Sequence, residues 1–209
     1  MSEHDVFAHI LKTGQRAGQA NAPLLLDIGC CSKLPLHPIE RPANVARLRP
    51  VGTDLRHLVQ VGYPSASVIG CDIRRDFIDR GYEFYCDRDT CQIPFFVADI
   101  FDIALCPFPQ AANNARPSLK DVQSLNELRG RVKYIYAGSF FHLFDEGTQE
   151  AIARRLATLL DVSKENGPAV LFGRHVSKTE EGVIDDAMGR YVEQPTFLVL
   201  YRSRLTSNL

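Results

Sequence analysis

Three short apolar runs that each close on an aspartate constrain the fold of this chain more than any other feature. The aspartates that end the runs are Asp27, Asp72 and Asp99. Apolar runs without alternation are typical of strands that are buried on both faces of a parallel sheet. The carboxyl ends of such strands meet at one edge of a doubly wound sheet, and ligands bind at that edge. The pattern therefore predicts a ligand site lined by three carboxylates.

Helices are predicted between the strands. We expect strands over residues 24–28, 67–71, 95–98, 132–136 and 169–172, and helices over residues 4–15, 53–60, 74–84 and 121–128 and after an N-cap at Asp145. The apolar face of the helix at 74–84 is predicted to consist of Phe77, Ile78, Tyr82 and Phe84. Strands that alternate with helices predict an α/β chain with a doubly wound, mostly parallel sheet. A length of 209 residues fits a single domain.

The first strand runs into Gly29 and Cys30, which predict a tight turn. Glycine lets a ligand approach bare backbone, and a cysteine adds little bulk. An acid and a glycine also end many strands that bind nothing, so this turn alone assigns no function. A nicotinamide enzyme also places an acid after its second strand, but it expects two further glycines in the first turn and gives Asp99 no role.

The segments LLLDIGCCS, GTDLRHL, VIGCDI, FFVADIFD and VKYIYAGSFFHLFD resemble class I S-adenosylmethionine-dependent methyltransferases. They are most similar to the fungal secondary-metabolism branch, which methylates polyketide or meroterpenoid intermediates. The resemblance spans residues 22–173. It implies a Rossmann-like fold, S-adenosyl-L-methionine as the cofactor, and methyl transfer to a carboxylate or hydroxyl oxygen of a small apolar metabolite. An inactive cofactor-binding relative is the alternative, and a nicotinamide-dependent oxidoreductase is less favoured.

The resemblance places the amino-acid tail of the cofactor at the first strand end. Asp27 would hold the tail ammonium, and the turn at Gly29 and Cys30 would pass under the methionine moiety. The N-terminus of the following helix would face the tail carboxylate, because helix N-termini carry partial positive charge.

The same resemblance places the nucleoside at the next two strand ends. Asp72, with Ile73 beside it, would accept hydrogen bonds from the ribose hydroxyls. Asp99 would accept from the adenine amino group, with the Ile100 amide next to the ring. Asp72 has a plainer interpretation as the N-cap of the following helix.

Ser139 and His142 follow the fourth strand, where relatives line the methyl-transfer site. His142 would act as a general base if the acceptor is a hydroxyl. A carboxylate acceptor needs no base, and a histidine at this place is as often structural.

Two segments depart from the family pattern. Residues 33–51 contain four prolines and three arginines, whereas such connections usually take about 2–6 residues. We interpret this irregular insertion as translated intron, since Ser32 and Lys33 can be encoded with a splice-donor sequence; a genuine surface loop is the alternative. Residues 191–209 form an atypical tail, interpreted in the same way, with a genuine closing strand as the alternative. The sheet is thus expected to be incomplete at both ends.

Composition restricts the partners. The chain has 24 basic and 25 acidic side chains, so it has no basic excess for nucleic acid. It contains no apolar run of about 18 residues and no secretory signal, so a cytoplasmic protein without a membrane partner is expected. Cys86 and Cys91 lack the paired spacing of zinc ligands, and no metal site is predicted. The expected partner is a small-molecule substrate, and the sequence sets no oligomeric state.

Overall fold

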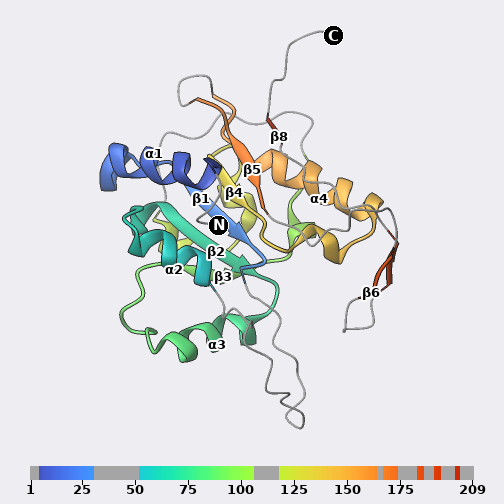
Figure 1. The fold of residues 1–209 in the computed structure, drawn as a ribbon, viewed down its shortest axis with the longest axis horizontal. Coiled ribbons are helices and arrows are strands. Elements are labelled where there is room, and N and C mark those ends of the chain that lie inside the picture. Colours follow the sequence, from blue (N-terminus) through green and yellow to red (C-terminus); the bar gives the residue numbers. More distant parts are fainter. Residues whose placement is uncertain are drawn as a thin grey trace.

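A parallel sheet forms the centre of the chain. The computed structural model describes residues 5–30, 52–105, 118–163 and 167–173, with three short strands beyond them. The sheet has the order β3-β2-β1-β4-β5-β8 (Figure 1). Its strands are β1 (Leu25–Ile28), β2 (Val68–Asp72), β3 (Phe95–Val97), β4 (Tyr134–Tyr136), β5 (Val170–Phe172) and β8 (Tyr201–Arg202). The first five are parallel, and the order reverses between β1 and β4. The predicted doubly wound sheet is confirmed.

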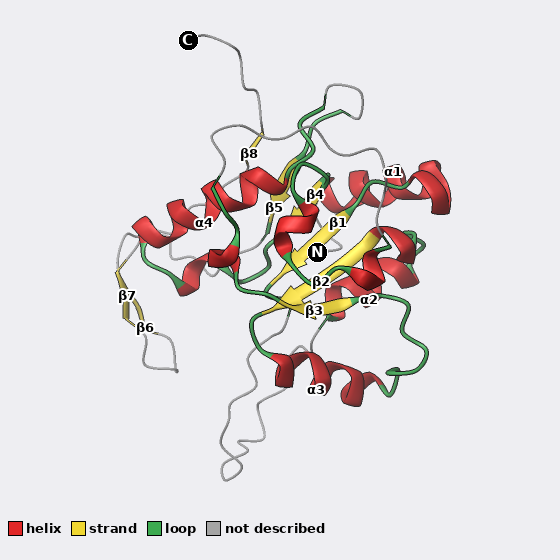
Figure 2. Cartoon of the chain, turned by 180° about the vertical axis from the view of Figure 1, so that it is seen from behind, coloured by secondary structure: helices red, strands yellow, loops and turns green. Residues whose placement is uncertain are grey.

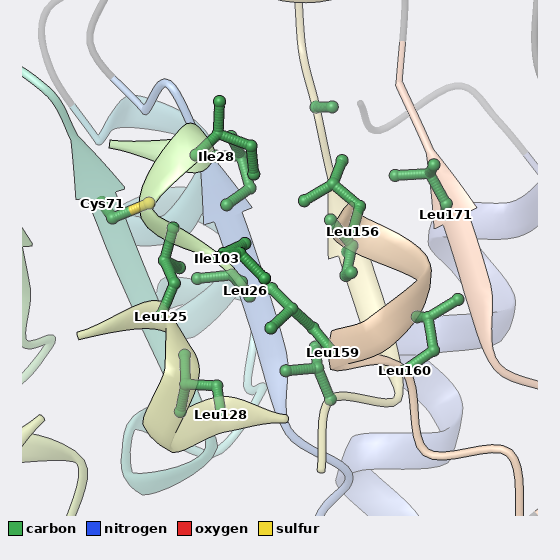
Figure 3. Packing of buried hydrophobic residues seen from close by; sticks show 14 of the residues in the cluster. Leu26, Ile28, Cys71, Ile103, Leu125, Leu128, Leu156, Leu159, Leu160 and Leu171 are labelled. Atoms are coloured by element: carbon green, nitrogen blue, oxygen red, sulfur yellow. The ribbon is translucent and has the colours of Figure 1, made fainter. Parts of the chain in front are cut away.

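One face of the sheet packs against α4 (Glu146–Leu159) and the 3-10 turns η2 (Ile100–Asp102) and η4 (Leu125–Leu128). The side chains of this core are apolar and nearly all inaccessible, and they include Leu26, Ile28, Leu125, Leu156 and Leu159 (Figure 3). Burying each such side chain contributes about 1.5–3 kcal/mol before the cost of ordering it. Because side chains alternate along a strand, Leu26 and Ile28 of β1 both face α4.

The opposite face packs against α1 (Asp5–Asn21) and α2 (Thr53–Gln60), so the sheet has helices on both sides (Figure 2). Leu25 of β1 lies in this second core with Ile10 of α1 and with Leu55 and Leu58 of α2. The helix α3 (Arg75–Tyr85) packs near β3 through a smaller cluster that contains Phe77.

Most predicted elements are confirmed within about two residues. The helix α2 has the predicted bounds, and Asp145 caps α4 by accepting a hydrogen bond from the Thr148 amide at 2.9 Å. The helix α1 continues past its predicted end, across a non-helical residue at Gly18.

Two local predictions are wrong. Phe84 is 67% exposed and does not join the buried face of α3. Helical spacing gives the direction of a side chain, but burial also requires a neighbour, and among the described aromatic rings Phe84 contacts that of Tyr85. The single helix expected at 121–128 is instead two 3-10 turns, η3 (Leu119–Asp121) and η4, because Ser124 and Glu127 form a capping box that starts a new turn.

The C-terminal strands are short. The strand β8 pairs antiparallel with β5, so the sheet extends beyond β5 at this point. The strands β6 (Val183–Asp185) and β7 (Tyr191–Glu193) form a separate antiparallel pair. The other residues of the predicted tail lie outside the described part of the chain. Within the described part, no helix combines the length and apolar character needed to cross a membrane.

The predicted insertion at 33–51 also lies outside the described residues, but the chain on either side of it meets. The Gly52 amide donates a hydrogen bond of 2.8 Å to the Cys30 carbonyl. Without residues 33–51, the chain would run Cys30, Cys31, Ser32, Gly52. The same hydrogen bond would then be the closing bond of a four-residue β-turn.

We therefore expect a chain without residues 33–51 to keep its fold and to melt at a higher temperature. Loop-closure entropy changes by about 0.6 kcal/mol per doubling of loop length, so the gain is on the order of 2 kcal/mol. Thermal unfolding of both chains, followed by circular dichroism, measures the difference. A shortened chain that does not fold would show that the segment belongs to the core.

Candidate functional site

A row of side chains crosses the sheet at the point where the strand order reverses. Asp27 of β1 lies in register with Gly70 of β2 on one side and with Tyr136 of β4 on the other. The row continues to Phe95 and Phe172 on the next strands. Residues paired in register share a face, so these side chains lie on the α2 side. The Phe95 ring occupies the space where a side chain on Gly70 would lie, because a Cβ there would come within 2.6 Å of Cδ1 of that ring.

Asp27 is the most unusual residue of this row. The residue is 3% exposed, no described residue donates a hydrogen bond to its carboxylate, and its oxygens are not completely closed to solvent. Burial raises the pKa of the Asp27 carboxyl well above its ordinary value, and the nearby carboxylates of Asp54 and Asp72 raise this pKa further. A buried carboxylate without a donor is costly, so the site is suited to a ligand that brings a cation or a donor.

The turn after β1 adopts the conformation that only glycine tolerates well. Gly29 has a φ of 65°, and its amide and that of Cys30 both donate to the Cys71 carbonyl, at 3.0 and 3.2 Å. A Cβ on Gly29 would lie 2.6 Å from Cδ2 of the Phe140 ring. The close approach at Gly29 is thus made by Phe140, which ties this turn to the loop after β4. Contact of Gly29 and Cys30 with a ligand stays a prediction.

Asp72 ends β2 at the same sheet edge, and its side chain is 6% exposed. Its Oδ1 accepts a hydrogen bond from the Arg74 amide at 2.9 Å. The interpretation of Asp72 as the N-cap of the following helix is wrong, because the N-cap of α3 is Arg74 and no side chain caps that helix. Ile73, immediately after it, is 61% exposed. Contact of Ile73 with a ligand stays a prediction.

Asp99 follows β3 and is the N-cap of η2. Its Oδ1 accepts from the Phe101 amide at 2.8 Å, whereas no described residue donates to its Oδ2. The side chain of Ile100 is buried in the core on the α4 face, so only the backbone of Ile100 is available to a ligand at this edge.

The loop after β4 brings aromatic rings to the turn after β1. Ser139 has a φ of 54° and is exposed. Phe140 packs against Phe141 and Phe144, with ring centroids 5.9 and 5.2 Å apart. The backbone of His142 lies in the 3-10 turn η5 (Phe141–Leu143), and its side chain is outside what the structure describes.

Sequence reasoning missed one pair of residues at this site. Tyr136 donates a hydrogen bond from its phenol to Oδ2 of Asp54, at 3.0 Å. Asp54 lies in the first turn of α2, inside the segment GTDLRHL. An acid at the start of a helix that follows the first turn was the available signal, but its partner is 82 residues away in the chain.

The acids are spread along the sheet edge. Among the described side chains, no three histidine, cysteine, aspartate or glutamate residues come close enough together to hold a metal ion.

Comparisons with known proteins find methyltransferases of fungi among the relatives of this chain. No family model matches the chain. It is 29% identical over 164 residues to the O-methyltransferase phiE of a fungal species. The aligned residues make up 78% of this chain and 42% of that relative. It is 31% identical to the methyltransferase adrK of Penicillium rubens, over 52% of this chain and 33% of the relative. It is also 31% identical to the O-methyltransferase atr3 of Stereocaulon alpinum, over 65% of this chain and 29% of the relative.

The chain thus spans less than half the length of each of these curated relatives. The predicted resemblance to fungal methyltransferases is confirmed by these sequence matches. Among solved structures, an S-adenosylmethionine dependent methyltransferase from Mesorhizobium loti aligns with a TM-score of 0.42 at 14% identity, over 90% of this chain and 60% of that one.

Proposed function

We propose that this chain forms the cofactor-binding core of an S-adenosylmethionine-dependent methyltransferase that methylates an oxygen of a small apolar secondary metabolite. Asp27 carries the proposal, because it is a buried carboxylate without a described donor, placed where the strand order reverses. Ligands of doubly wound sheets bind at that reversal. The curated relatives named methyltransferases support the same chemistry.

The residues at the sheet edge fit the parts of this cofactor. Asp27 would accept from the ammonium of the amino-acid tail, Asp72 from the ribose hydroxyls, and Asp99, through its open Oδ2, from the adenine amino group. Ile73 would lie against the apolar face of the adenine. When bound, the cofactor supplies an electrophilic methyl group on a sulfonium.

The loop after β4 would serve the acceptor. Its aromatic cluster of Phe140, Phe141 and Phe144 lies beside the first turn and would exclude water from an apolar substrate. With a hydroxyl acceptor, His142 would take up the proton. With a carboxylate acceptor, no proton is transferred, and positioning supplies the rate enhancement.

Isothermal titration with S-adenosylmethionine, S-adenosylhomocysteine and NAD⁺ tests the proposal. We expect both sulfur ligands to bind and NAD⁺ not to bind. Binding of NAD⁺ alone would assign the site to a nicotinamide enzyme. Binding of the sulfur ligands without turnover on any polyketide or meroterpenoid acid would favour a cofactor-binding relative without catalysis.

Alanine at Asp72 or Asp99 is expected to weaken S-adenosylhomocysteine binding by about 1–3 kcal/mol each, the contribution of a hydrogen bond to a charged acceptor. Both acids lie at the ends of strands, so the fold should persist. The control is alanine at Asp89, an exposed acid between α3 and β3. Unchanged affinity in both variants would place the pocket elsewhere.

A further inference from the structure

Tyr136 links the first turn of α2 to the strand beside Asp27. It lies opposite Asp27 in the register of β1 and β4, and its side chain is 3% exposed. Its ring packs against Phe172 with centroids 5.2 Å apart, and Gly138, which lacks a side chain, leaves the space that the phenol oxygen occupies. The phenol is therefore fixed in position where it donates to Asp54.

A structural role for Asp54 accounts for only part of this arrangement. A carboxylate in the first turn of a helix is favourable, because it faces the partial positive charge of the N-terminus. That role does not require a buried tyrosine to hold the carboxylate on the same side of the sheet as Asp27. Two neighbouring carboxylates repel, and a site that keeps them together stores a cost that a bound cation would relieve.

A second observation points to such a cation. Asp27 is 3% exposed, and no described residue donates a hydrogen bond to its carboxylate. Asp27 is nearly buried and has no donor among the described residues, although its oxygens are not completely closed to solvent. Asp54, which accepts from the Tyr136 phenol, lies close enough to Asp27 to raise its pKa.

We propose that Asp54 and Asp27 together bind the primary ammonium group of the cofactor tail, and that Tyr136 is the positioning residue that orients Asp54. This inference rests on the proposed function. It adds a second carboxylate and a tyrosine to the recognition of the tail, and it makes the tail ammonium a determinant of affinity that is separate from the nucleoside.

Two ligands separate the tail from the nucleoside. S-adenosylhomocysteine carries the ammonium, and 5′-methylthioadenosine has the same nucleoside without the amino-acid tail. Titration of both into the full chain and into Asp54→Asn and Tyr136→Phe is the test. We expect the dissociation constant for S-adenosylhomocysteine to rise about 10-fold in Asp54→Asn and about 3-fold in Tyr136→Phe, as for loss or misorientation of a charge-assisted hydrogen bond. The constant for 5′-methylthioadenosine should change less than about 2-fold.

Tyr63→Phe is the matched control. Tyr63 is a buried tyrosine of the same core, and its phenol donates to the Pro23 carbonyl, at the end of the sheet away from the site. This variant also loses a buried hydrogen bond, but it should leave the ratio of the two affinities unchanged. Thermal melts of all variants report any loss of folding.

The outcomes are distinct. A loss of affinity for the tailed ligand alone supports the inference. Equal weakening of both ligands would assign Asp54 and Tyr136 a purely structural role and overturn it, as would an unchanged affinity for S-adenosylhomocysteine. If the unmodified chain binds neither ligand, the proposed function itself fails.

Discussion

Asp27→Asn is expected to weaken cofactor binding at least about 30-fold and at the same time to raise the melting temperature of the ligand-free protein. Asparagine keeps the size of the side chain but removes its charge. Removing one partner of a buried charge pair costs about 2–5 kcal/mol of binding, which corresponds to an affinity loss of at least about 30-fold. In the ligand-free protein the same substitution removes a buried carboxylate that has no described donor, so the fold should gain stability.

The pH dependence of stability gives an independent measurement of the same group. Burial, Asp54 and Asp72 raise the pKa of Asp27 above its ordinary value of 3.8. Among the described ionisable groups, Tyr136 lies beside Asp27 on the same face, and Cys71, on the opposite face, interacts with it electrostatically. Between the ordinary and the raised pKa, the folded state binds a proton that the unfolded state has released. The free energy of unfolding of the ligand-free protein should therefore fall as pH rises through this window.

Affinity for the tailed ligand should rise over the same pH window, because only ionised Asp27 attracts the ammonium. Urea unfolding and titration at several pH values measure the two trends. In Asp27→Asn both trends should flatten. Identical pH profiles for the two proteins would show that Asp27 is not the group responsible.

Gly29→Ala is expected to destabilise the fold by about 2–4 kcal/mol. Its φ of 65° costs a residue with a Cβ about 1–2 kcal/mol, and overpacking against a ring adds about 1–3 kcal/mol. The overpacking part comes from the Phe140 ring, because the added Cβ would lie 2.6 Å from it. The backbone part and the overpacking part can therefore be measured separately. Urea unfolding at equilibrium measures the change.

Gly167→Ala is the control for this prediction. Gly167 has a φ of 71°, and nothing lies within 4 Å of a Cβ placed on it. It should lose only the backbone part. In a protein that already carries Phe140→Ala, Gly29→Ala should also lose only the backbone part. Equal losses at Gly167 and Gly29 in the unmodified protein would contradict the contact with Phe140.

The sheet and its three edge acids could be predicted from the sequence, because an unbroken apolar run is typical of a buried strand and the acid marks its carboxyl end. Asp27, Asp72 and Asp99 all lie at or just after the carboxyl ends of neighbouring strands. What those acids bond could not be predicted. Asp72 and Asp99 each accept from an amide two residues further on, and this depends on local turn geometry that the residue types alone do not fix.

The pairing of Tyr136 with Asp54 lay beyond sequence reasoning for a different reason. It depends on β4 lying next to β1 in one register and on α2 packing over that face. A shift of one residue would turn Tyr136 to the opposite face. Phe84 shows the converse limit, since its direction followed from the helical period but its burial required a covering neighbour, which the described residues do not supply.

The hydrogen bond between Cys30 and Gly52 also offers an engineering opportunity. This hydrogen bond holds Cys30 and Gly52 next to each other. A folded reporter domain could therefore be inserted between them without forcing the flanking backbone apart. That point lies between the turn after β1 and the first residue before α2, both beside the predicted ligand site. A pair of fluorophores or a permuted fluorescent protein at this junction would convert occupancy of the site into an optical signal.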